Sequence, residues 1–289
     1  MGITLTKPAV QLTIFDESKH RKNSPLDLKR EALYQKYADR LAINPLLTRQ
    51  LVSFQANKKA PLYRWFKYKE GFSSELVNYL IRLTKSGVNA DFRVLDPFAG
   101  AGTTLSVAAE MGCQATGIEI LPVAVAAIRA RLLASSVNPE VFVHHLNSVE
   151  SLSFDQPFSG SSCFRHLKIT EGAFPEETER VISLFDGFID SIQDQEVKYL
   201  FWFACLVILE DVSYTRKDGQ YLRWDSRAGR ILKSNFNKGL IWNFKSALTA
   251  KLHLMLGDIK KRHGKAPDQN VEILEGSCLV ELPKIPANT

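Results

Sequence analysis

Hydrophobic and polar positions along the chain follow two different periods. Short apolar runs at Val94–Leu95, Ala115–Ile120 and Val271–Leu274 are each bounded by turn residues and predict three strands. The first two runs are each followed by a helical pattern, and the second of these patterns covers Pro122–Ala134. Alternating strands and helices of this kind predict a parallel sheet with helices on both faces, hence an α/β fold.

Most of the remaining chain has the period of amphipathic or buried helices. A helix is expected near Leu26–Ala42, since Pro25 suits a helix start and Asn44-Pro45 suits a stop. Residues 138–170 are ambiguous, and Val141–Leu146 is a candidate short strand. Three further helices are expected near Pro175–Ile192, Gln195–Leu209 and Lys238–Arg262.

These patterns suggest a division of the chain into three parts. Residues 1–60 form an N-terminal arm, and residues 61–137 together with 271–289 form the α/β core. Residues 138–270 form a mostly helical insertion between the second and third strands. Insertions at such places read DNA or cover active sites, so this part is the candidate DNA-contacting region.

Composition limits the class of protein. The 289 residues are 45% hydrophobic and 24% charged, which is typical of a soluble globular protein. The four cysteines are scattered and indicate neither a zinc site nor a disulfide framework, and no metal is expected. The most apolar run, Tyr199–Leu209, is shorter than the roughly 20 residues that span a bilayer. The N-terminus lacks the apolar core of a signal peptide, so we expect a cytoplasmic protein without membrane contact.

Charge is distributed unevenly along the chain. The formal net charge is +6 and the sequence pI is about 9.0, which permits a polyanionic partner. Residues 171–211 contain ten acidic and two basic side chains, whereas residues 214–263 contain twelve basic and three acidic ones. This separation fits either a nucleic-acid surface or a basic helix that pairs with an acidic neighbour, and the pattern leaves both open.

The segment Asp96-Pro97-Phe98-Ala99-Gly100-Ala101-Gly102-Thr103-Thr104 carries the most specific chemistry. A glycine-rich turn between a strand and a helix exposes backbone N–H groups to a ligand. The dinucleotide fingerprint requires a third glycine where Leu105 stands, and a phosphate-binding loop of the Walker type requires a lysine that this turn lacks. The turn therefore predicts a nucleoside ligand of another kind.

The order Asp-Pro-Phe-x-Gly-x-Gly-Thr-Thr resembles the first motif of the DNA amino-methyltransferases, which use S-adenosylmethionine to methylate adenine N6 or cytosine N4 of DNA. The resemblance implies a Rossmann-like class I methyltransferase sheet with the glycine turn at the methionine end of the cofactor. It also implies that Glu119, which ends the second strand, holds the ribose hydroxyls, since a carboxylate accepts two hydrogen bonds from a diol. The cofactor residues implied by this motif are Asp96, Pro97, Phe98, Gly100, Gly102, Thr103, Thr104, Glu119 and Ile120.

Two further segments match the same family. Gly71-Phe72-Ser73 lies upstream of the glycine turn, where related enzymes contact the methionine carboxylate. Ser73 is also a candidate N-cap for the amphipathic helix that follows it. After the third predicted strand, Ser277 stands where the family commonly has an Asp that contacts the adenine.

The polar stretch from Ser213 to Asp225 interleaves basic and aromatic side chains around the turn signal Asp218-Gly219. Arginine and aromatic groups stack on bases or hold phosphates, so this stretch is a candidate DNA contact. The alternative is a hairpin whose aromatic residues pack on the core. The candidate DNA-binding residues are Arg216, Lys217, Tyr221, Arg223 and Trp224.

The family's catalytic tetrapeptide, Asp/Asn/Ser-Pro-Pro followed by an aromatic residue, does not occur in this sequence. Asp155-Gln156-Pro157-Phe158 is the nearest sequence but lacks one proline, so no catalytic residue is assigned. We expect the cofactor-binding part of a truncated or split methyltransferase, with an incomplete sheet and a second polypeptide supplying the remaining strands and catalytic loop. A non-catalytic cofactor- or DNA-binding remnant and an RNA methyltransferase are the alternatives.

Overall fold

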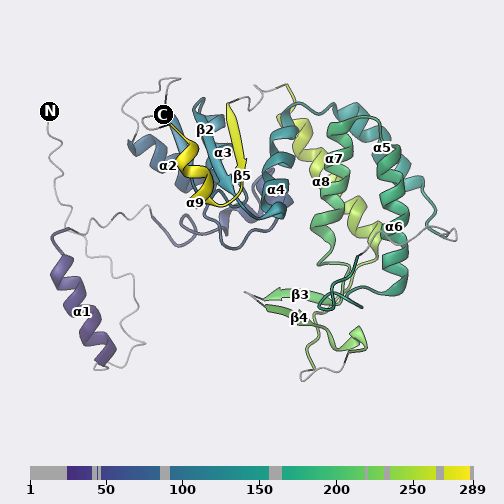
Figure 1. Cartoon of the computed structure of the whole chain (residues 1–289), viewed down its shortest axis with the longest axis horizontal. Coiled ribbons are helices and arrows are strands. Elements are labelled where there is room, and N and C mark those ends of the chain that lie inside the picture. The colour runs from purple at the N-terminus through teal and green to yellow at the C-terminus, as the bar shows by residue number, and fades with distance from the viewer. Residues whose placement is uncertain are drawn as a thin grey trace. The chain divides into compact units, whose positions relative to one another are not determined.

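The computed structural model describes residues 25–40, 44, 47–84, 92–155, 165–218, 221–230, 235–264 and 270–286. The chain divides into two compact units, Met1–Arg49 and Gln50–Thr289. In the first unit, helix α1 (Pro25–Tyr37) buries none of its residues. The second unit contains every other helix and strand considered below (Figure 1).

The second unit contains a parallel sheet of three strands in the order β1-β2-β5. Strand β1 (Arg93–Asp96) pairs with β2 (Gln114–Glu119), and β2 pairs with β5 (Val271–Glu275). Helix α3 (Thr103–Glu110) connects β1 to β2, and α4 (Pro122–Leu132) follows β2. The predicted α/β fold with a Rossmann-like parallel sheet is confirmed, and the sheet looks incomplete, as expected.

Helices cover one face of this sheet. Val94, Ala115 and Ile273 point toward a buried cluster that contains Leu105 of α3 and Ile81 of α2 (Ser74–Thr84). Within the described residues the opposite face is covered only in part: Ile118 on this face is buried, and the short helix α9 (Cys278–Glu281) contacts β2. The opposite face and the segment 281–286 border an open hollow of about 450 Å³. The strand residues of this face that border the hollow are Arg93, Leu95, Gln114, Thr116, Glu272 and Leu274.

Four helices between β2 and β5 form the largest part of the core. They are α5 (Pro139–Ser151), α6 (Glu176–Ser191), α7 (Gln195–Ile208) and α8 (Phe244–Arg262). Asn138, Asp194 and Asn243 cap α5, α7 and α8 by accepting backbone N–H bonds at their first turns. The three predicted helices in this region are confirmed, although α8 begins six residues later than expected, at the residue after its cap.

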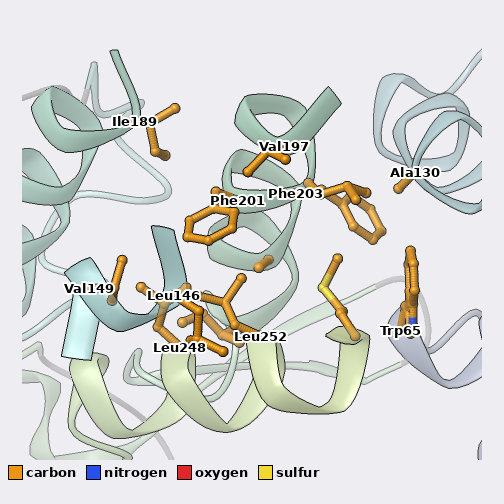
Figure 2. Close-up of a cluster of buried hydrophobic side chains, with 14 of the residues drawn as sticks. Trp65, Ala130, Leu146, Val149, Ile189, Val197, Phe201, Phe203, Leu248 and Leu252 are labelled. Atoms are coloured by element: carbon orange, nitrogen blue, oxygen red, sulfur yellow. The ribbon is translucent and has the colours of Figure 1, made fainter. Parts of the chain in front are cut away.

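The predicted strand Val141–Leu146 is wrong, because these residues lie within α5. Asn138 is the N-cap and Pro139 occupies the first helical turn, a combination that favours helix initiation. Phe142, Leu146 and Val149 are then buried at helical spacing, and Figure 2 shows Leu146 and Val149 within the buried cluster.

The buried cluster of these helices continues onto the sheet. Phe201 and Phe203 of α7 pack in one cluster with Leu248 of α8, and the same cluster includes Ala130 of α4 and Trp65 (Figure 2). Alanine on α4 permits this close approach of the helices. The helical part between β2 and β5 therefore packs against the helix layer of the sheet.

Asp258 fixes the segment that precedes α2. Its carboxylate is buried within α8 and accepts hydrogen bonds from Leu62 N (3.0 Å), Arg64 Nε (3.0 Å) and Trp65 Nε1 (2.9 Å). Leu62 has a φ of 65°, and Tyr63 N donates to Pro61 O at 2.8 Å, so this backbone forms a strained γ-turn. Asp258 stabilises that strained conformation because it satisfies the N–H of Leu62 itself.

We expect Asp258→Ala to reduce the free energy of unfolding by about 3–5 kcal/mol, because it leaves a guanidinium and buried N–H donors without their acceptor. Urea denaturation measures the change. The control is Asp190→Ala, whose exposed carboxylate pairs with Lys198 and contributes less than about 1 kcal/mol. Equal losses in the two variants would contradict this role of Asp258.

Strands β3 (Thr215–Asp218) and β4 (Tyr221–Trp224) form an antiparallel hairpin between α7 and α8. In the described ranges, no helix is long and apolar enough to cross a membrane. Likewise, no group of three or more His, Cys, Asp or Glu side chains in those ranges is arranged to hold a metal ion.

Candidate cofactor-binding site

The sheet brings three predicted segments to one edge. In a parallel sheet the carboxyl ends of the strands lie together, and ligands of open α/β sheets bind at this edge. Ala99 N donates to Ile118 O at 3.0 Å, which joins the glycine turn to β2, and Gly276 N donates to Glu119 O at 3.0 Å, which joins the end of β5 to β2. Asp96, Glu119 and Ser277 therefore lie at neighbouring strand ends.

The turn after β1 requires its glycines. Gly100 and Gly102 have φ values of 52° and 75°, a region that side chains with a Cβ rarely adopt. A Cβ on Gly100 would lie 2.8 Å from Cε1 of Tyr68, and one on Gly102 would lie 2.6 Å from Cγ1 of Ile128. The turn therefore requires glycine for two reasons: its backbone is left-handed at both positions, and the side chains of Tyr68 and Ile128 leave no room for a Cβ.

The ends of the turn differ in exposure. Asp96 Oδ1 accepts the N–H of Phe98 at 3.1 Å, which closes the turn after β1. Pro97 is half-buried and Phe98 is 76% exposed, so the Phe98 ring is open to a ligand or a partner. Thr103 is buried and Thr104 is half-buried at the start of α3.

Glu119 joins the backbone segments of the candidate site. Its carboxylate is buried and accepts N–H bonds from Gly100 (2.7 Å), Ile120 (2.9 Å) and Leu121 (2.7 Å). These bonds tie the glycine turn to the start of α4. Since a carboxylate offers about four acceptor positions, three are already used, and a ribose diol would have to share or replace one of them. Ile120 itself is 64% exposed beside this carboxylate.

Ser73 has a structural function at the start of α2. Its hydroxyl donates to Leu51 O and accepts Leu76 N at 3.1 Å, so the predicted N-cap of α2 is confirmed. The one O–H donor of the hydroxyl is therefore engaged, and one of its two acceptor lone pairs is used. Phe72 is 38% exposed, and Gly71 borders a cavity beside the glycine turn.

Tyr68 is a site residue that the sequence did not indicate. Its ring contacts the position where a Cβ on Gly100 would lie. Burial, together with the nearby Glu119 and Glu70 carboxylates, raises the pKa of its hydroxyl. The only sequence signal for Tyr68 was its position three residues before Gly71, because the family resemblance covers Gly71–Ser73.

Ser277 is half-buried and precedes the short helix α9 (Cys278–Glu281). Its backbone carbonyl accepts the N–H groups of Val280 (2.8 Å) and Glu281 (2.9 Å). The side chain makes no capping hydrogen bond to α9. The structure therefore places Ser277 close to the end of β2 with its hydroxyl uncommitted to the helix that it begins.

The predicted DNA-binding residues divide between the two faces of the hairpin. Arg216 lies directly opposite Arg223, and Asp218 lies opposite Tyr221, so these four residues share one face. Lys217 and Trp224 lie on the other face. Tyr221 is 78% exposed, whereas Trp224 is half-buried with the Arg230 guanidinium 4.1 Å from its ring centroid.

The hairpin also touches the segment before Gly71. Lys217 Nζ lies 3.4 Å from Glu70 Oε1, and Lys69 Nζ donates to Lys217 O at 3.3 Å. The hairpin and the segment 69–71 are therefore neighbours. Residues 156–158 of the near-match to the catalytic tetrapeptide lie outside the described residues.

Comparison with known proteins identifies the family that the chain resembles. A family model described as DNA methylase (N6_N4_Mtase) matches residues 12–130, which include Gly71–Ser73, the glycine turn and Glu119. The Type II methyltransferase M.AvaI, from Nostoc sp. and from Anabaena variabilis, is 44% identical over 79% of this chain and 47% of its own length. The Type II methyltransferase M.BsoBI of Geobacillus stearothermophilus is 35% identical over 100% of this chain and 58% of its own.

The chain thus spans about half the length of the curated relatives that it matches. No solved structure matches it significantly. Members of the matched family depend on S-adenosylmethionine. The motif residues, their assembly at one sheet edge and these similarities agree: the chain belongs to the DNA amino-methyltransferase family.

Proposed function

We propose that this chain binds S-adenosylmethionine at the carboxyl edge of its sheet, for methyl transfer to adenine N6 or cytosine N4 of DNA. The observation that carries the proposal is the bond from Gly100 N to the Glu119 carboxylate, which joins two segments of the family motif in one structure. Glu119 would hold the ribose, and the glycine turn with Asp96 would lie along the methionine part. Ser277 and Ile120 would border the adenosine.

The cofactor supplies an electrophilic methyl group, and the protein's contribution is largely to position the acceptor nitrogen. The residues described above bind and orient the cofactor but include no assigned catalytic side chain. We therefore propose that strands completing the sheet, and the catalytic loop, come from polypeptide outside these 289 residues. The relatives, about twice as long, support this proposal.

The exposed side of the sheet also supports additional polypeptide. Within the described residues, β1 pairs with β2 only, so its other edge is unpaired. Leu95 on β1 is 44% exposed, and Leu279 and Val280 of α9 are 83% and 56% exposed. Parallel sheets are ordinarily buried on both faces, so we propose that a second polypeptide or a further segment of the same protein covers this side.

The hairpin is the proposed DNA contact, within the helical part that covers residues 138–270. Two arginines placed directly opposite each other repel, which destabilises an isolated hairpin. A DNA phosphate between or beside Arg216 and Arg223 would offset that repulsion. Arg223 is already oriented by Asp218, 3.1 Å away, and by the Phe236 ring, 4.6 Å from the guanidinium to the centroid. Exposed Tyr221 on the same face is available to stack on a base.

We expect Arg216→Gln to weaken binding of duplex DNA and to reduce the slope of log affinity against log salt by about one, because one phosphate contact is lost. Fluorescence anisotropy across a salt series measures both quantities. Arg82→Gln on α2 changes the net charge equally at an exposed position and should leave the slope unchanged. Identical slopes for Arg216→Gln and the unmodified protein would show that the hairpin does not contact DNA.

A methyl-transfer assay with labelled S-adenosylmethionine distinguishes the alternative functions. Transfer of labelled methyl to DNA but not RNA, after the missing polypeptide is supplied, supports the proposal. Transfer to RNA alone would favour the RNA methyltransferase. Cofactor binding without any transfer would favour a non-catalytic remnant.

A further inference from the structure

A basic cavity of about 370 Å³ lies behind the glycine turn. Its walls come from the segments 54–58 and 63–71, from the start of α3 and from the last turn of α4. Four lining residues are basic, namely Lys58, Arg64, Lys67 and Arg131, and none is acidic. A cavity with this charge favours a negatively charged ligand.

Arg131 is the most informative of these residues, because it is only 4% exposed. Its guanidinium lies 4.8 Å from the centroid of the Tyr63 ring, and one of its nitrogens donates to Ala101 O. Its Nε has no hydrogen-bond partner, and no carboxylate pairs with it in the part of the chain that the structure describes. Burial lowers the pKa of Arg131 to about 10, so the side chain still carries its charge at neutral pH.

A buried charge without a counter-ion is costly, and proteins ordinarily pair it. The start of α3 adds to the need for an anion. Gly102 is the N-cap residue, and no side chain caps the first-turn N–H groups of this eight-residue helix. Thr103, the first residue of α3, lines the cavity. The helix terminus and the guanidinium thus contribute positive potential to the same space.

The cavity wall is rigidly held. Tyr63 and Arg64 directly follow the γ-turn at Leu62, and Asp258 fixes this turn through Leu62 N and the Arg64 guanidinium. The Arg64 charge is therefore used by Asp258, whereas the exposed Lys58 and Lys67 stand at the wall with Arg131. Backbone strain that the surrounding structure maintains is a frequent property of binding sites.

We propose that this cavity binds an oxyanion, either a carboxylate or a phosphate, with Arg131 as its buried counter-charge and Lys58 and Lys67 at its entrance. Two sources have this chemistry. One is the carboxylate of the cofactor, since Gly71, Ala101 and Thr103 border both the cavity and the proposed cofactor site. The other is a phosphate of bound DNA. The existence of the oxyanion site does not depend on the proposed function. The identity of the molecule that supplies the oxyanion does rest on that function.

Inorganic phosphate is the first probe, and thermal unfolding of the 289-residue chain is the readout. We expect phosphate to raise the melting temperature progressively above that in sodium chloride of equal ionic strength, because a ligand that binds only the folded state stabilises it. Lys58→Ala and Lys67→Ala should each weaken phosphate binding about two- to fivefold. Lys59→Ala, an exposed neighbour outside the cavity lining, should leave it unchanged.

Arg131→Met tests the buried charge while preserving much of the side-chain volume. We expect this variant to lose the response to phosphate altogether; the lysine variants decide the result if Arg131→Met does not fold. Equal stabilisation by phosphate and chloride, or an unchanged phosphate response in Lys58→Ala and Lys67→Ala, would overturn the proposal.

Competition then identifies the source of the oxyanion. If the source is the cofactor carboxylate, phosphate weakens binding of S-adenosylmethionine but not of 5′-methylthioadenosine, which lacks the amino-acid group. If the source is DNA, Lys67→Ala weakens duplex binding and phosphate leaves S-adenosylmethionine unaffected. Phosphate binding in a chain that binds neither cofactor nor DNA would support the oxyanion site and reject the proposed function.

Discussion

Glu119→Ala is expected to weaken S-adenosylmethionine binding at least about a hundredfold. Two charge-assisted hydrogen bonds to a ribose contribute about 3–6 kcal/mol together, and each factor of ten in affinity corresponds to about 1.4 kcal/mol. The same substitution leaves the N–H groups of Gly100, Ile120 and Leu121 without an acceptor. We therefore also expect a loss of about 2–4 kcal/mol in the free energy of unfolding. Calorimetry and urea denaturation measure the two effects.

The control for this prediction is Glu272→Ala. Glu272 lies on β5 and is exposed on the opposite face of the sheet, where it accepts the Thr116 hydroxyl at 3.3 Å. Its removal should change the cofactor affinity by less than about twofold. A Glu119→Ala protein that is folded and binds the cofactor within threefold of the unmodified chain would show that Glu119 organises the turn without holding the ribose.

Gly100→Ala is expected to cause the second large loss. The left-handed φ of 52° costs a residue with a Cβ about 1–2 kcal/mol, and the contact with Tyr68 adds about 1–3 kcal/mol of overpacking. Because Gly100 N also donates to Glu119, movement of the turn would disturb the carboxylate and lower cofactor affinity about tenfold or more. Denaturation and calorimetry again give both values.

Gly112→Ala is a matched control, because Gly112 has a φ of 71° and its Cβ would meet no atom within 4 Å. It carries the same backbone cost without the contact and lies at the other end of α3. The double variant Gly100→Ala/Tyr68→Ala should regain the unfolding free energy lost through overpacking. It should still show the loss that comes from the left-handed backbone. Equal losses in Gly100→Ala and Gly112→Ala would contradict a packed glycine turn.

The strands and the longer helices could be predicted from sequence because their information is local. The helix expected at Pro175–Ile192 is observed at Glu176–Ser191, and the one expected at Gln195–Leu209 at Gln195–Ile208. The strand predicted at Val141–Leu146 was wrong for a local reason as well. The β-branched valines of this segment favour a strand, but Asn138 and Pro139 start a helix there.

The candidate site could be predicted only in part. A family motif identifies the glycine turn and Glu119, but it says nothing about side chains that arrive from elsewhere. Tyr68 lies in an irregular segment without periodicity, and Arg131 resembles an ordinary basic residue in the last turn of a helix. Both acquire significance only from tertiary packing, against Gly100 and Tyr63 respectively.

Coverage of the sheet was another property beyond the reach of the sequence pattern. Strand–helix alternation predicts helices on both faces as a rule for complete parallel sheets. It cannot tell which polypeptide supplies them. The exposed Leu95 and the open hollow beside it show that the described residues cover the second face only in part, at Ile118.

Isothermal titration of the folded 289-residue chain with S-adenosylmethionine tests the central claim most directly. We expect saturable binding of one cofactor per chain, weakened by Glu119→Ala and retained by Glu272→Ala. A chain with a cooperative unfolding transition that releases no heat and shows no thermal stabilisation with the cofactor would contradict the proposed cofactor site.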